Sequence, residues 1–133
     1  MTLTGTATTW VTLNTGDPWS NLRVKDLAFV DFNGNGITDV FSADGSSWRW
    51  HPSGQGVVYL EANVARVSDL RFGDLNGDGR TDVFYGNGRR WRYKSAGTGP
   101  WIQIALASEE SRDVWVANFD SDPKADIFFP QCY

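Results

Sequence analysis

With 133 residues, 41% of them hydrophobic and 21% charged, the chain has the size and composition of one globular domain, which excludes a disordered protein. The formal net charge is −4 and no basic stripe is present, so nucleic acid is not an expected partner. No apolar stretch reaches transmembrane length, so no membrane association is expected, and the single cysteine, Cys132, excludes an intrachain disulfide.

The first 25 residues are predicted to form two strands. Residues 1–10 are rich in threonine and lack both a basic start and an apolar run, so no signal peptide is expected. Residues 9–13 (TWVTL) match a later segment, residues 101–104 (WIQI), and residues 3–6 form a second short strand before them. We interpret the pair as the outer half of a sheet unit whose inner half lies elsewhere in the chain.

From residue 26 onward the chain repeats itself. Residues 31–41 (DFNGNGITDVF) return 43 residues later as residues 74–84 (DLNGDGRTDVF). A degraded third form, residues 118–128 (NFDSDPKADIF), follows after a further 44 residues. A fixed period of this size is typical of repeat architectures, in which each unit buries its apolar face by stacking on its neighbours.

Two complete units, residues 26–66 and 67–110, each contain four short runs with strand periodicity. The dipeptides Asp44-Gly45 and Asn87-Gly88 separate the second and third runs and predict type I′ hairpin turns. No helix is predicted. The expected strands are residues 26–30, 38–42, 48–50 and 57–60 in the first unit, and residues 69–73, 81–85, 91–93 and 101–104 in the second.

The third unit, residues 111–133, supplies two inner strands, residues 113–117 and 125–129. Four short strands per unit predict an all-β fold, a β-propeller of four-stranded antiparallel blades, with three blade units in one domain spanning residues 1–133. Residues 1–25 would complete the blade that residues 111–133 begin. Because three blades are too few to close a ring, we expect closure by oligomerisation: a homodimer with six blades, or alternatively a trimer with nine.

Oxygen-bearing residues recur at alternate positions of the three repeated loops. Side chains at loop positions 1, 3, 5 and 9, with the backbone carbonyl of position 7, can surround a hard cation, and Ca²⁺ prefers six to eight such oxygen ligands. The EF-hand's closing glutamate is absent, so the pattern predicts a strand–loop–strand calcium site. The predicted ligands are Asp31, Asn33, Asn35, Ile37 and Asp39 in the first loop, Asp74, Asn76, Asp78, Arg80 and Asp82 in the second, and Asn118, Asp120, Asp122, Lys124 and Asp126 in the third.

An alternative explanation of these loops needs no metal. Asp, Asn and Gly are common in tight connections, because Asx side chains hydrogen-bond to the backbone two residues further on. If calcium binds, its expected role is structural: neutralising clustered carboxylates and coupling metal binding to folding.

These motifs resemble the FG-GAP/VCBS repeat of integrin-like β-propellers, which is marked by Phe-x-Asp-x-Asn-Gly-x-Gly-x-Thr-Asp-Val-Phe. The further Asp/Asn-Gly-x-x-Trp-x-Trp/Tyr turn, the glycine-rich loop and the next tryptophan make the chain similar to the Psathyrella velutina lectin type of propeller, over roughly residues 8 to 133. That resemblance implies recognition of terminal N-acetylglucosamine, or of a sugar such as fucose, in shallow pockets between adjacent blades.

A sugar site needs an aromatic ring face and planar hydrogen-bonding groups. Because side chains alternate along a strand, the repeated aromatic residues of each blade's third strand lie on one face of that strand. We expect the sugar site at the end of the blade where the turn joins strands two and three. Repeated tryptophan at one blade position is, alternatively, inter-blade packing. The candidate sugar-binding residues are Asp44, Ser46, Trp48 and His51 in one blade, Asn87, Arg89, Trp91 and Tyr93 in the next, and Asp17 and Trp19 from a neighbouring blade.

The expected function is therefore a calcium-stabilised, multivalent carbohydrate-binding protein, a lectin. The alternative is a protein-interaction propeller of the integrin kind, with structural calcium. An enzyme is not expected, because a lone His, a lone Cys and carboxylates committed to metal leave no nucleophile–base set. Calcium loops suit a secreted, extracellular protein, although no signal peptide is visible.

Overall fold

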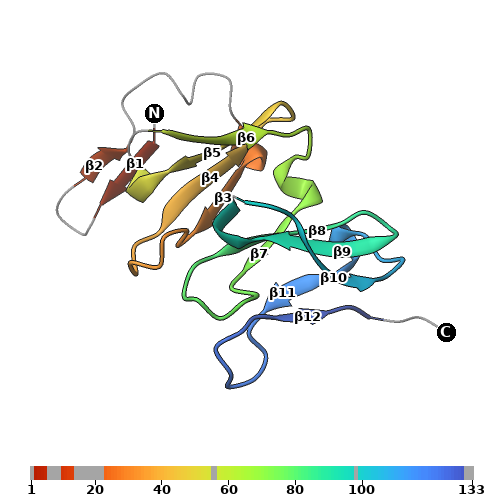
Figure 1. The fold of residues 1–133 in the computed structure, drawn as a ribbon. Helices are drawn as coiled ribbons and strands as arrows, with labels where there is room; N and C mark the ends of the chain where they lie inside the picture. The colour runs from red at the N-terminus through yellow and green to blue at the C-terminus, as the bar shows by residue number, and fades with distance from the viewer. Residues whose placement is uncertain (1, 6–9, 14–22, 55–56, 98, 131–133) are drawn as a thin grey trace.

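The structure is a computed structural model, and it describes residues 2–5, 10–13, 23–54, 57–97 and 99–130. Two four-stranded antiparallel sheets follow each other along the chain, with a two-stranded sheet before the first and another after the second (Figure 1). The all-β prediction is confirmed, and the two central sheets have the strand order of propeller-like blades.

The first blade has strand order β3-β4-β5-β6, with neighbours in sequence paired as neighbours in space. Its strands are β3 (Leu27–Val30), β4 (Asp39–Ala43), β5 (Ser47–His51) and β6 (Val58–Ala62). The second blade repeats this order with β7 (Arg71–Gly73), β8 (Asp82–Gly86), β9 (Arg90–Lys94) and β10 (Ile102–Leu106). Each strand lies within one or two residues of its predicted position.

The remaining strands form two separate pairs at opposite ends of the chain's fold (Figure 1). The N-terminal pair is β1 (Thr2–Gly5) with β2 (Trp10–Leu13), and the C-terminal pair is β11 (Trp115–Ala117) with β12 (Asp126–Phe128). Both pairs are antiparallel. Within the single chain the two half-sheets do not pair with each other.

The core lies between successive blades rather than within one sheet. Strand β4 is buried along its whole length. Phe41 shows this directly: its ring stacks on Phe32 at 5.6 Å within the blade and meets the edge of Phe72, from the next blade, at 5.2 Å between ring centroids. Stacking of this kind is what a repeat architecture requires.

The expectation that the chain has no helix is wrong in one detail. A single turn of 3₁₀-helix precedes the first strand of each unit: η2 (Val24–Asp26), η4 (Val67–Asp69) and η6 (Ser111–Asp113). Two further one-turn helices, η3 (Pro52–Gly54) and η5 (Ser95–Gly97), follow the third strands. One turn is too short to give a periodic sequence signal.

The repeated aspartate at the end of η2, η4 and η6 explains why these turns form. Asp26 accepts the backbone N–H of Arg23 at 3.0 Å, Asp69 that of Arg66 at 2.9 Å, and Asp113 that of Glu110 at 3.0 Å. Each carboxylate therefore closes a local turn three residues long. The sequence pattern predicted that the same aspartates begin strands.

The turn between the second and third strands also differs from its prediction. A type I′ turn needs positive φ at two residues, but among the described residues only Ser53 and Ala96 outside glycine have positive φ. Gly45 alone is left-handed here, with φ of 92°. Asp44 instead builds an Asx turn, in which its Oδ1 accepts the backbone N–H of Ser46 at 2.8 Å and of Ser47 at 2.9 Å.

Candidate functional site

The Asp-rich loops lie at one end of the blades, and the first two fold around their first residue. The carboxylate of Asp31 accepts backbone N–H groups from Gly34 at 2.8 Å, Asn35 at 3.1 Å and Gly36 at 2.7 Å. The second loop repeats this arrangement around Asp74. The position-1 carboxylate thus wraps the loop into a compact curve with the alternate side chains exposed along it.

Positions 3, 5 and 7 of the first two loops also make local bonds. The side-chain oxygens at positions 3 and 5 each accept the N–H two residues further on, as the Asx alternative predicts. The residues at positions 3, 5 and 7 are half-buried or exposed. A cation here would take side-chain oxygens from Asn33 and Asn35 in the first loop and from Asn76 and Asp78 in the second. Ile37 and Arg80, at position 7, would offer their backbone carbonyls.

The ninth residue of the first loop, Asp39, is buried and bridges two connections. Its Oδ2 accepts the N–H of Phe32 at 2.9 Å, and its Oδ1 accepts the N–H of Ser53, in the loop between the third and fourth strands, at 2.7 Å. Both oxygens therefore have backbone partners. Asp39 joins the two loops at this end of the blade.

Asp82 occupies the equivalent position in the second blade. Its carboxylate accepts the N–H of Leu75 at 2.8 Å and that of Ala96 at 3.0 Å. Burial raises the pKa of Asp82 above its ordinary value, and the neighbouring charge of Asp78 adds to the rise, while the backbone donors oppose it. A cation near this carboxylate would favour its ionised form.

Three carboxylates come together in the third loop. Asp120, Asp122 and Asp126 each place one oxygen within 4.8 Å of the others, and no second such group occurs among the residues that the structure describes. Their chemistry fits calcium, which favours clustered carboxylate oxygens. This loop has Ser121 and Pro123 where the first two have glycine, so the sequence alone favours the second loop instead.

Consecutive loops are joined by hydrogen bonds between blades. Thr81 of the second loop donates to the Asp31 carbonyl from both its N–H, at 3.3 Å, and its hydroxyl, at 2.8 Å. Ala125 of the third loop donates its N–H to the Asp74 carbonyl at 2.6 Å. The approach is close: a Cβ on Gly34 would lie 2.6 Å from a carbonyl oxygen of the second loop. The loops therefore form a continuous row along one end of the blades.

A pocket of about 400 Å³ lies at the opposite end, between the second blade and the C-terminal pair. It is formed by η4, by the end of β8 with its turn, and by η6. Its lining is mostly polar, with acids, hydroxyls, an amide and a guanidinium, and it includes Tyr85, whose ring packs against Trp101 at 6.0 Å between centroids. The lining residues are Ser68, Asp69, Tyr85, Gly86, Asn87, Glu110, Ser111 and Arg112.

Two contacts are made by the residues at η6 that line this pocket. Glu110, the residue before η6, places Oε2 3.0 Å from Nε of Arg112 in an exposed ion pair. The Ser111 hydroxyl accepts the Gly86 N–H at 2.8 Å and so joins η6 to the end of β8. The pocket therefore has a fixed backbone and several exposed groups that can both donate and accept.

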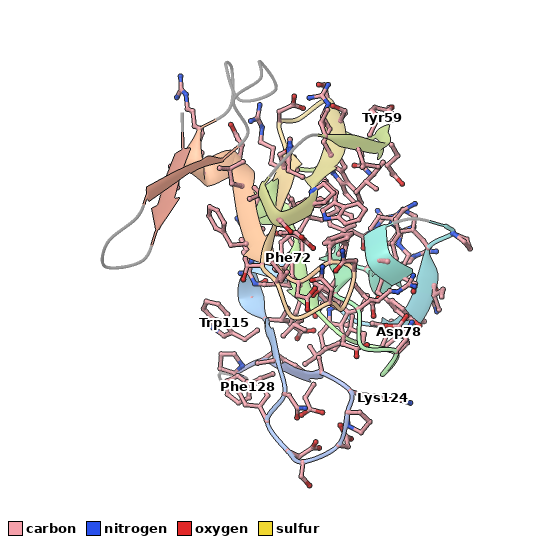
Figure 2. The ribbon with its side chains drawn as sticks, turned by 90° about the vertical axis from the view of Figure 1, so that its left-hand side faces the viewer. Tyr59, Phe72, Asp78, Trp115, Lys124 and Phe128 are labelled. Carbon is pink, nitrogen blue, oxygen red and sulfur yellow. The ribbon has the colours of Figure 1, made fainter. Side chains whose placement is uncertain are left out.

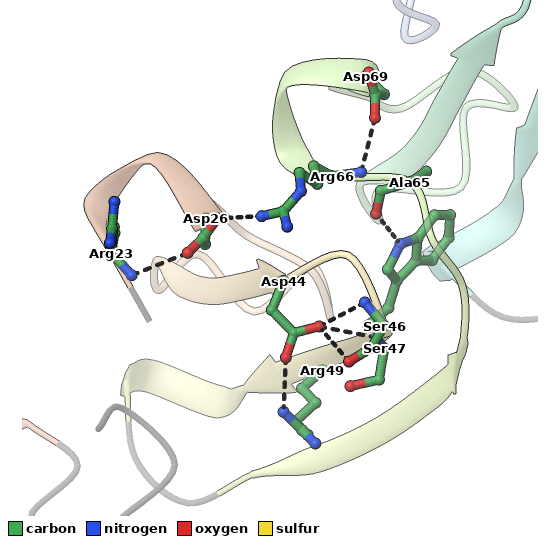
Figure 3. Close-up of polar contacts among 10 residues, drawn as sticks. Arg23, Asp26, Asp44, Ser46, Ser47, Arg49, Ala65, Arg66 and Asp69 are labelled. Atoms are coloured by element: carbon green, nitrogen blue, oxygen red, sulfur yellow. Dashed lines mark hydrogen bonds and ion pairs between the residues drawn. The ribbon is translucent and has the colours of Figure 1, made fainter. Parts of the chain in front are cut away.

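Between the first and second blades, the space that corresponds to this pocket is crossed by the side chain of Arg66. Arg66 stands at the repeat position of Glu110, and its Nη1 reaches Asp26 Oδ1 at 3.4 Å (Figure 3). Its guanidinium also covers the neighbouring turn, where a Cβ on Gly45 would lie 2.8 Å from Nη2. Under this cover Asp26 is only 5% exposed, whereas the equivalent Asp69 faces the open pocket.

For three of the predicted sugar-binding residues the prediction is wrong, because their side chains are buried. Trp48 and His51 are fully buried and Trp91 is 7% exposed, so none presents a ring face to a ligand. The Nε1–H groups of Trp48 and Trp91 donate to the carbonyls of Ala65 at 3.0 Å and Glu109 at 3.1 Å. The tryptophans are therefore packing residues that anchor the connection leaving their own blade, as the packing alternative predicted.

The buried His51 also interacts within the blade. Its Nε2 lies 3.2 Å from the hydroxyl of Ser42 on the neighbouring strand. The sheet pairing places His51 opposite Val40, and its side chain is buried in the interior.

The other candidates have varied positions. Asn87 lines the pocket, and Arg89 is exposed on the same turn. Asp44 and Ser46 form the equivalent turn of the first blade, where burial of Asp44 is outweighed by its bonds to Ser47 and Ser46 and by Arg49, so that its pKa falls below the ordinary value. Tyr93 is half-buried on β9, and Asp17 and Trp19 lie outside the described residues.

Most of the pocket was not predicted. Asp69 is part of a repeated motif that the sequence does show, but its place beside Asn87 depends on the one-turn helices. Glu110 and Arg112 stand at positions where the repeats differ in charge, which is the signal that could have identified them.

Residues 31–85 match the family model of the FG-GAP-like repeat. The matched segment runs from the first Asp-rich loop through the second, up to β8. No curated protein and no solved structure matches the chain. The match and the antiparallel four-stranded sheets together fit a repeat of the β-propeller type.

Within the residues that the structure describes, no helix is long and apolar enough to cross a membrane.

Proposed function

We propose that this chain is a carbohydrate-binding protein and that the pocket between η4 and η6 is its sugar site. The observation that supports the proposal is the composition of the pocket: about 400 Å³ lined by two carboxylates, two serine hydroxyls, an amide and a guanidinium. Small-molecule sites have volumes of about 300–1,000 Å³ and a few well-placed polar groups. In this proposal the carboxylates accept from vicinal hydroxyls and Arg112 donates.

The expected ligands are glycans that end in N-acetylglucosamine or a fucose-type sugar. Both present adjacent ring hydroxyls, and N-acetylglucosamine adds an amide that can pair with the side chain of Asn87. We propose that the ligand is bound and not transformed.

The sugar site is tested by binding with a matched pair of variants. Asn87→Ala is expected to weaken glycan binding about tenfold, which corresponds to a lost hydrogen bond of about 1.4 kcal/mol. Asp44→Ala is the control, because Asp44 makes the same turn bonds in the first blade, where Arg66 crosses the equivalent space. Titration of immobilised terminal N-acetylglucosamine and fucose measures both.

The same experiment can reject the proposal. Equal binding by the two variants would show that the turn is needed only for folding and that the sugar binds elsewhere. A folded wild-type chain that binds no glycan on an array would remove the carbohydrate function.

Calcium is part of the proposal, with the third loop as the favoured site. Three carboxylates with oxygens within 4.8 Å repel one another, and a divalent cation would relieve this repulsion. Chelation is expected to lower the melting temperature of the wild-type chain by several degrees, as follows from the loss of about 1–2 kcal/mol. Exposed ligands of this kind suit the calcium concentrations found outside cells, where we place the protein.

Asp122→Asn supplies the control for the calcium prediction. It keeps the oxygen that accepts the Lys124 N–H and removes one charge, so the variant should gain less stability from calcium than the wild type. Differential scanning calorimetry with and without calcium measures the difference. Identical melting of the wild type in calcium and in chelator would favour the purely local Asx role of these loops.

The full proposal includes a closed ring of six blades made from two chains, each contributing three blade units. Oligomeric binding sites would add avidity to weak individual sites. The second candidate function is a protein-interaction propeller of the integrin kind, which is favoured by the match of residues 31–85 to the FG-GAP-like repeat. This second function would be supported if the protein forms the dimer and binds calcium but binds no glycan.

A further inference from the structure

We infer that the two ends of the chain's blade stack dock on each other between two copies, through specific contacts that repeat those between blades inside the chain. The leading face consists of β1, Arg23, Phe29 and Thr38. The trailing face consists of β12, Asp113, Asn118 and Phe128. The inference rests on the ring assembly proposed above and not on sugar binding.

Aromatic exposure is the first argument for this pairing. Phe41 and Phe84, the repeat equivalents of Phe128 in the two complete blades, are fully buried, whereas Phe128 is 53% exposed. Inside the chain Phe41 is covered by Phe72 at 5.2 Å between ring centroids. The equivalent of Phe72 at the leading face is Phe29, which is 58% exposed. Each face therefore has the apolar ring that the other face needs.

The shape of the trailing face agrees with this argument. Trp115 and Phe128 project from the same side of the C-terminal pair (Figure 2). Together with Arg112, Asp113 and Pro130 they border a hollow of about 480 Å³. The hollow lies where the next blade would stack, as the second blade stacks on the first.

Charge complementarity is the second argument. Inside the chain, Arg66 at the start of the second blade reaches Asp26 at the start of the first, at 3.4 Å. The equivalent pair across the two copies is Arg23 with Asp113. Both side chains are exposed, and they carry opposite charges.

Backbone pairing is the third argument. Thr81 and Ala125 donate to the carbonyls of Asp31 and Asp74 in the preceding loops. By the same repeat, Thr38 of the second copy would donate to the carbonyl of Asn118. Strand β12 has no partner on its outer edge among the described strands, and neither has β1. Antiparallel pairing of β12 with β1 of the second copy would complete a four-stranded blade and remove both exposed edges.

The interface is self-complementary as a whole. Phe29 of each copy meets Phe128 of the other, so two identical junctions relate the copies by a two-fold axis and close the ring. A second copy is the occupant that fits, because it alone is certain to present a leading face with these residues in this register.

Light scattering coupled to gel filtration tests the assembly. The wild-type chain is expected to have about twice the chain mass of 14.8 kDa. Phe29→Asp and Phe128→Asp should each reduce the mass to that of one chain, since each places a charge in both junctions. Tyr59→Asp is the control: Tyr59 is an exposed aromatic residue on β6, away from both faces, and this variant should keep the wild-type mass.

Complementation makes the test specific. A mixture of the Phe29→Asp and Phe128→Asp chains restores one intact junction, so it should form a heterodimer although each variant alone is monomeric. Arg23→Glu and Asp113→Arg should each weaken the dimer at low salt, and the double variant should recover it. Recovery by neither pair would overturn the inferred contacts.

The outcomes separate this inference from the two proposals beneath it. A wild-type mass of one chain would overturn both the ring assembly and the docking of the two faces. A wild-type dimer that survives Phe29→Asp and Phe128→Asp would keep the assembly but overturn these contacts. Loss of glycan binding by Asn87→Ala in a protein that remains dimeric would leave the docking supported, because Asn87 belongs to neither face.

Discussion

Replacing Trp48 with alanine is expected to lower the free energy of unfolding by about 3–5 kcal/mol, the usual cost of removing a buried aromatic side chain. Trp48 has no exposed surface and meets the rings of Phe41 and Trp101 edge-on at 5.6 Å and 6.0 Å between centroids. Its Nε1–H also satisfies the carbonyl of Ala65. The variant loses packing within the blade, packing on the next blade and the anchor of the connection between them.

Urea unfolding followed by circular dichroism measures this loss, at one protein concentration for all variants. Tyr59→Ala is the control, because Tyr59 is 59% exposed and its removal should change the free energy by no more than about 0.5 kcal/mol. If the Trp48 variant were as stable as the control but failed to bind glycans, Trp48 would be a ligand contact and the packing explanation would be wrong.

Replacing Asp39 with alanine should cost about 2–4 kcal/mol, since two backbone N–H groups at a buried position lose their acceptor. The affected donors belong to Phe32 and Ser53, and the carboxylate that joins them is fully buried. The loop at position 32 and the connection at position 53 would then no longer be tied together.

Removing calcium with a chelator distinguishes two possible roles of Asp39, as a hydrogen-bond acceptor for the backbone and as a calcium ligand. If the backbone bonds carry the effect, the difference in stability between wild type and Asp39→Ala should persist in full after calcium is removed. A difference that disappears in chelator would mean that Asp39 stabilises the fold through a bound cation. Asp39→Asn, which keeps one acceptor oxygen, should fall between the wild type and the alanine variant.

The strands and loops could be predicted because they repeat. Three forms of one segment, 43 and 44 residues apart, define the blade boundaries, and alternation of apolar residues defines the strand faces. The one-turn helices could not be predicted this way: Asp26, Asp69 and Asp113 carry a local capping role that looks like the start of a strand. The turn at Asp44 was misread for a similar reason, because its side chain, and not a second left-handed residue, closes the turn.

The sugar candidates show a different limit. A repeated tryptophan has the same sequence signal whether it faces a ligand or the core, and only the stacking of blades shows that Trp48 and Trp91 are enclosed. The missing glycines of the third loop make it a weaker calcium candidate than the second loop on sequence alone. The structure nevertheless brings its three carboxylates together. The pocket itself is assembled from three separate segments, and no local pattern joins them.

The alternation between Arg66 and Glu110 has a consequence for how the assembled protein would meet its target. Arg66 stands at this repeat position at the first junction. In the proposed ring Arg23 would stand at the equivalent position between copies, so the open pocket at Glu110 would occur once per chain. All blades of a propeller point the same strand ends to one side, so a ring of two chains would hold two such openings on one flat side. Such a protein would lie flat on one glycan-bearing surface and bind it through two pockets on opposite sides of the ring, with its Asp-rich loops facing away from that surface.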